Sequence, residues 1–152
     1  MAMSLKGVSN VYVHKSRQAV STDIYLKECI NKRLLPFIEK NHENDDYVFW
    51  PDLASAHYAT NVLHRLQEKN VPVVAKGNNP PNVPQARPIE TVWSILEQKV
   101  YAHNWQARNL DLLAKRIKLK AKELEPKMLQ AMVQDIRKQL RSMWRNGLYS
   151  IC

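Results

Sequence analysis

Two runs of four bulky residues, YVFW at 47–50 and VPVV at 71–74, constrain most strongly what this chain can fold into. Neither run contains a charged residue, which is typical of strands buried on both faces of a sheet. Between them, an amphipathic helix is predicted around Val62, Leu63 and Leu66. Because strand, helix and strand follow one another through short joints, the order predicts a parallel βαβ unit.

The first forty residues predict a short strand, a second short extended piece that begins at Gln18, and one helix. Residues 8–15 are rich in β-branched and aromatic side chains, as strands are. A helix is expected after Ser21 or Thr22, since either side chain could cap it. Pro36 is expected to kink or interrupt this helix, because proline lacks the backbone N–H that helices use.

The second half of the chain predicts three helices. Pro88 and Pro126 suit the first position of a helix, and an apolar pattern over residues 110–124 predicts another helix between those two. The Pro88 helix carries a buried stripe that includes Trp93. The Pro126 helix carries an apolar stripe that ends at Trp144, and this stripe could also be the seam of a homodimer.

Length and composition favour one intracellular domain. A chain of 152 residues can bury one core, and we expect an α/β part at 1–104 followed by a basic helical end at 105–152. Its two cysteines, Cys29 and Cys152, cannot form a disulfide framework or a cysteine-rich zinc cluster. No apolar run is long enough to suggest a signal peptide or a membrane span, so neither secretion nor a membrane partner is expected.

Positive charge is concentrated near the end of the chain. The net charge is +9, and residues 108–145 hold eleven lysines and arginines against four acids, a net +7. Such a cluster favours DNA or another polyanion as partner, although a solvated polar helix face is the simpler alternative. The cations predicted to contact nucleic acid in this region are Lys115, Arg116, Lys118, Lys120, Lys122, Arg137, Lys138 and Arg141.

Two carboxylates are placed where a metal site could form. Asp52 follows the predicted strand at 47–50, and Glu90 lies in the first turn of the helix that opens at Pro88. Placed together, they could share Mg²⁺ or Mn²⁺ and support an in-line phosphoryl displacement. Helix capping and the helix dipole explain the same residue types at such positions, so spacing alone leaves both interpretations open.

Two segments resemble the catalytic motifs of mariner-type transposases. PDLASAHYA is similar to that family's Asp-Asn-Ala-Pro-x-His segment and keeps Asp52, Ala54 and His57. PQARPIETVWSILEQKV is similar to its Pro-Asp-Leu-Asn-Pro-Ile-Glu-x-x-Trp-x-x-Leu-Lys segment. The matching residues there are Pro84, Pro88, Ile89, Glu90, Trp93 and Leu96.

The resemblance implies an RNase H-like α/β fold that lacks its first strand, with a helical C-terminal extension. It also implies a DDE endonuclease that cleaves DNA and transfers strands in transposition, in the nucleus, with Mg²⁺ or Mn²⁺ and without a small-molecule cofactor. Asp52 would be the second carboxylate, Glu90 the third and His57 a supporting residue. The first aspartate has no counterpart in this chain, so we expect impaired catalysis.

One departure from the family pattern bears on function. Arg87 replaces an asparagine three residues before Glu90, where a cation could pair with Glu90 or contact a DNA phosphate. Two functions therefore stay open, a DDE endonuclease domain and a non-catalytic nucleic-acid-binding or interaction protein derived from a transposase.

Overall fold

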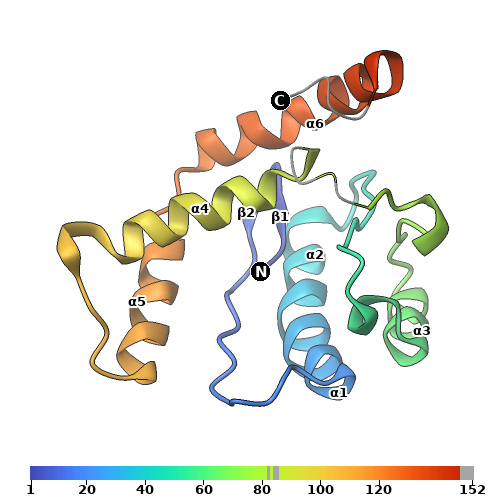
Figure 1. Ribbon diagram of the computed structural model, residues 1–152. Coiled ribbons are helices and arrows are strands. Elements are labelled where there is room, and N and C mark those ends of the chain that lie inside the picture. Colours follow the sequence, from blue (N-terminus) through green and yellow to red (C-terminus); the bar gives the residue numbers. More distant parts are fainter. Residues whose placement is uncertain (82, 84–85, 148–152) are drawn as a thin grey trace. The chain divides into compact units, whose positions relative to one another are not determined.

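A computed structural model describes residues 1–81, 83 and 86–147, and the chain forms two compact units (Figure 1). The first unit contains Met1 and residues 14–81. The second contains residues 2–13 and the chain from residue 82 onward. The helices expected on either side of residue 104 both belong to this second unit.

Helices dominate both units, so the predicted α/β RNase H-like fold is wrong. In the described part of the chain, the one sheet pairs two antiparallel strands, β1 (Met3–Ser4) and β2 (Gly7–Val8). Of the strand predicted at 8–15, Val8 alone is in a strand. No helix among the described residues has the length and apolarity that crossing a membrane requires.

The predicted strands YVFW and VPVV run parallel but share a single bridge, between Phe49 and Val73. Phe49 N–H donates to Pro72 O at 2.7 Å, and Val74 N–H donates to Phe49 O at 2.9 Å. Pro72 has no N–H with which to extend the ladder, and one bridged pair is too little for an independently stable sheet. The βαβ prediction therefore placed the two segments side by side correctly, but they form a single bridge instead of two full strands.

The amphipathic helix between these segments is present as α3 (Thr60–Glu68). It buries Val62 and Leu66, while Leu63 stays partly exposed. Residues three or four apart on a helix share a face, which explains why Val62 and Leu66 pack inward together.

The first unit opens with a long helical segment made of α1 (Thr22–Ile24), the π-helix η1 (Tyr25–Leu34) and α2 (Leu35–His42). Ser21 caps it as predicted, since its hydroxyl accepts a hydrogen bond from Ile24 N–H at 3.3 Å. Pro36 does not end the segment. It lies in the first turn of α2, directly after the change from the π-helix η1 to α-helix.

A buried amide fixes the loop that follows YVFW in the first unit. Asn79, 4% exposed, follows the short helix η3 (Lys76–Asn78) and accepts a hydrogen bond from Trp50 Nε1–H at 2.8 Å. Its own Nδ2 donates to Pro51 O at 2.8 Å and to Tyr58 Oη at 2.7 Å. Tyr58 in turn donates to Val74 O at 3.1 Å. One side chain thus connects both ends of this loop.

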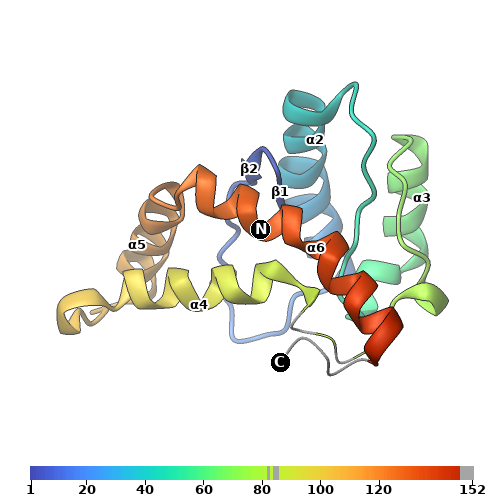
Figure 2. The same ribbon diagram turned by 90° about the horizontal axis from the view of Figure 1, so that it is seen from above.

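The second unit is built from α4 (Pro88–Val100), α5 (Leu110–Lys122) and α6 (Pro126–Asn146), and the 3-10 helix η5 (Ala102–Asn104) follows α4. The helix starts predicted at Pro88 and Pro126 are confirmed. Helix α4 packs against α5 and α6, and α6 also contacts β1 and β2 (Figure 2). The buried side chains of α4 and α6 are Val92, Leu96, Val100, Leu129 and Met143.

Candidate functional sites

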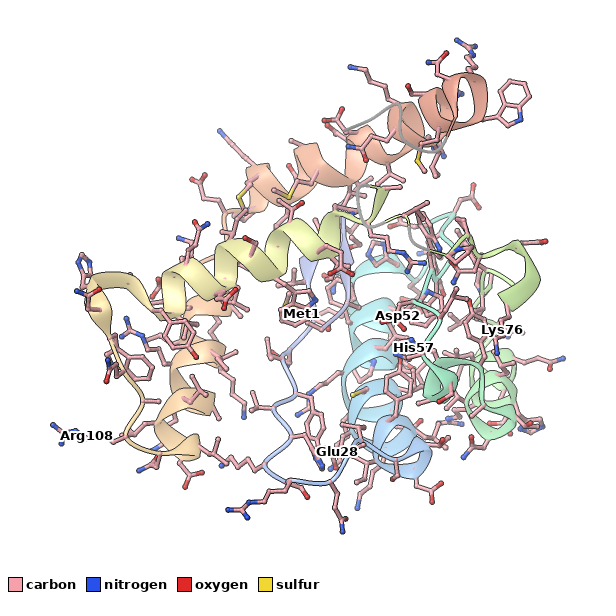
Figure 3. The ribbon with its side chains drawn as sticks, viewed as in Figure 1. Met1, Glu28, Asp52, His57, Lys76 and Arg108 are labelled. Carbon is pink, nitrogen blue, oxygen red and sulfur yellow. The ribbon has the colours of Figure 1, made fainter. Side chains whose placement is uncertain are left out.

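Asp52 lies in the loop after Pro51, beside the 3-10 helix η2 (Ser55–Tyr58), with His57 next to it (Figure 3). Its Oδ1 accepts a hydrogen bond from Ala54 N–H at 2.8 Å and lies 2.7 Å from His57 Nδ1. An aspartate that binds the N–H two residues later forms an Asx turn. Asp52 therefore shapes its own loop while 58% of its side chain stays exposed.

His57 links Asp52 to the long helical segment. Its ring centre lies 4.5 Å from that of Tyr25, with the planes inclined by 46°. Burial raises the pKa of Tyr25 far above its usual range, with smaller contributions from Cys29 and Asp52, so the phenol stays protonated. When the neutral His57 ring directs Nδ1–H to Asp52, its Nε2 can accept a proton or bind a metal ion.

Glu90 lies in the first turn of α4, as predicted, but its side chain is exposed. The buried side of α4 is formed by Val92, Leu96 and Val100, and this orientation leaves Glu90 outside the core. Trp93, predicted to be buried, is 39% exposed for the same reason. Arg87 immediately precedes the helix and is partly buried.

The structure does not unite the two predicted metal ligands within one unit. Asp52 belongs to the first unit and Glu90 to the second. Among the described residues, no three histidine, cysteine or carboxylate side chains are grouped as metal ligands would be. Binding of Mg²⁺ or Mn²⁺ by Asp52 and Glu90 therefore stays a prediction. Of the matched motif, Pro84 lies outside the described residues.

The predicted basic residues of α5 separate into two groups. Arg116 Nε–H donates to Val100 O at 2.5 Å, and its guanidinium carbon lies 4.4 Å from the centre of the Trp105 ring. Lys120 forms an ion pair with Glu123 at 2.8 Å. Arg116 thus connects α5 to the end of α4 and to Trp105, while Lys120 is paired locally at the end of α5. The exposed lysines share the other side of the helix: Lys115, Lys118 and Lys122.

Helix α6 carries four exposed cations on one side, which we call the α6 basic face: Arg137, Lys138, Arg141 and Arg145. None of them forms an ion pair with another described residue. They lie opposite the buried Leu129 and Met143, and a shallow depression that they line also includes Gln134, Ser142 and Asn146. Polar side chains thus surround the cations.

Sequence reasoning missed Trp144. It was assigned to the apolar stripe of the Pro126 helix, but it is 85% exposed. The spacing contained a signal, because Trp144 follows Arg137 by seven residues and residues two turns apart share a helix side. Trp144 therefore borders the α6 basic face.

No protein-family model matches the chain, and no curated protein matches it.

Proposed function

We propose that this chain binds DNA without sequence specificity, through the α6 basic face. The observation that carries the proposal is that four exposed cations lie on one side of one helix without ion partners among the described residues. Unpaired surface cations attract phosphates and release the counterions that surround DNA. Contacts of this kind position a protein on DNA but read no bases.

The dimensions of α6 suit a run of phosphates. Arg137 and Arg145 are eight residues apart, which corresponds to about 12 Å of helix axis. Phosphates of one strand recur about every 3.4 Å along the DNA axis, so this length spans about three to four of them. The exposed lysines of α5, Lys115, Lys118 and Lys122, could add contacts from the same unit.

The test compares two variants that each lower the net charge from +9 to +5 by replacing four cations with glutamine. One replaces the α6 basic face. The control replaces four exposed cations of the first unit: Arg17, Lys27, Lys40 and Lys76. DNA affinity is measured by fluorescence anisotropy over a series of salt concentrations.

We expect the α6 variant to reduce the slope of log affinity against log salt by about 3.6, that is about 0.9 for each phosphate that the protein no longer neutralises. The control should reduce the slope far less, since its cations are distributed over four separate segments of the first unit. Equal slopes for the two variants would show that overall charge, rather than the α6 basic face, governs binding.

Metal-dependent cleavage, strand transfer and a nuclear location rest on the family resemblance alone. Among the described residues, no three histidine, cysteine or carboxylate side chains are grouped as metal ligands would be. We therefore expect the purified chain to leave supercoiled plasmid intact in the presence of Mg²⁺ or Mn²⁺. Nicking that disappears in Glu90→Ala would instead establish an endonuclease.

A further inference from the structure

An exposed tryptophan at the edge of the α6 basic face adds a second kind of contact. Trp144 is 85% exposed, and its neighbours along the helix are Arg141 three residues earlier and Arg145 one residue later. An indole ring is one of the largest apolar groups in a protein, and beside a basic surface it offers a partner a flat aromatic face next to positive charge. The cations beside the ring favour a negatively charged partner.

We propose that Trp144 stacks on unpaired bases, so that the α6 face prefers single-stranded to double-stranded DNA. This inference rests on the proposed function. Bases in a duplex are already stacked on each other and do not offer their faces to a surface side chain. Bases of a single strand do, and aromatic side chains beside a basic surface bind them without regard to sequence.

The cations of the α6 basic face and Trp144 make different contacts with DNA. Arg141 and Arg145 contact successive phosphates, while the indole at the edge of the α6 basic face receives a base. The phosphate contacts are common to single and double strands. The stacking contact is available to the single strand alone, so Trp144 is the residue that distinguishes the two.

The experiment measures affinity for an oligothymidylate and for a duplex of equal length, with wild type, Trp144→Leu and Trp144→Phe. Removing the aromatic partner of a stacked base typically weakens binding roughly 5- to 150-fold. We expect that weakening for the oligothymidylate in W144L, retention of most affinity in W144F, and little change for the duplex. The slope of affinity against salt should stay as in wild type for both variants.

Trp93→Leu on α4 is the matched control, because Trp93 is a second partly exposed tryptophan of the same unit, at 39% exposure. It should keep the wild-type preference. Circular dichroism and thermal unfolding check that each variant is folded, and the exposure of Trp144 makes a large loss of stability unexpected for its variants.

The outcomes separate this inference from the proposed function. If wild type binds neither DNA, the proposed function fails and the inference fails with it. If wild type binds both DNAs equally and W144L changes neither affinity, stacking is refuted while DNA binding, as the proposed function requires, remains. Stacking is also refuted if W144L weakens both DNAs equally and dissociates a dimer in sedimentation, since Trp144 would then belong to an interface between copies.

Discussion

Replacing Asn79 by alanine tests the account of the loop that carries Asp52. The substitution removes three hydrogen bonds of a 4% exposed side chain, to Trp50, Pro51 and Tyr58. At about 1 kcal/mol for each hydrogen bond, the free energy of unfolding should fall by about 3 kcal/mol. The effect belongs to the first unit, because all four residues lie in it.

Urea unfolding followed by circular dichroism measures this change, and Asn78→Ala is the matched control. Asn78 is the exposed neighbour in the chain, and its side chain makes no hydrogen bond with another described residue. Its replacement should change the free energy of unfolding by less than about 0.5 kcal/mol. If Asn79→Ala costs as little as Asn78→Ala, the buried network does not stabilise the loop and our reasoning is wrong.

Two further predictions concern Tyr25 and Arg116. The folded state raises the pKa of Tyr25, so the unfolded chain releases this proton first, near pH 10, and stability should fall as the pH rises above that value. Tyr25→Phe should lessen this fall in unfolding measured on both sides of pH 10, and an unchanged slope would contradict it. Arg116→Lys keeps the charge but loses the planar contact with Trp105, so it should cost about 1 kcal/mol of stability in urea unfolding. A free energy of unfolding equal to that of wild type would contradict a stabilising role for this contact.

Helix positions were predictable from local signals. Ser21, Pro88 and Pro126 mark helix starts through capping and the fixed backbone angle of proline, and these effects act within one turn. Strands were not predictable in this way. YVFW and VPVV have the composition of buried strands, but a strand exists through its partners, and Pro72 limits the ladder to one bridge.

The same contrast between local and long-range contacts applies to the candidate sites. The pairing of Asp52 with His57 lies within five residues of chain, and the motif indicated a shared role for the two. The predicted position of Asp52 at a strand end depended on a sheet that did not form, and a metal site shared by Asp52 and Glu90 stays a prediction. The apolar character of Trp144 favoured a position in the core, but its angular position around α6 leaves the side chain exposed.

The like charges of the α6 basic face destabilise the helix that carries them. Arg141 lies four residues from both Arg137 and Arg145, and each such pair of like charges destabilises a helix by about 0.2–0.5 kcal/mol. Arg145 offsets part of this loss of helix stability by interacting favourably with the helix dipole, since it lies in the last turn. A bound polyanion would cancel the repulsion that remains. The like charges thus lower the stability of the free helix, and binding of a polyanion would stabilise it.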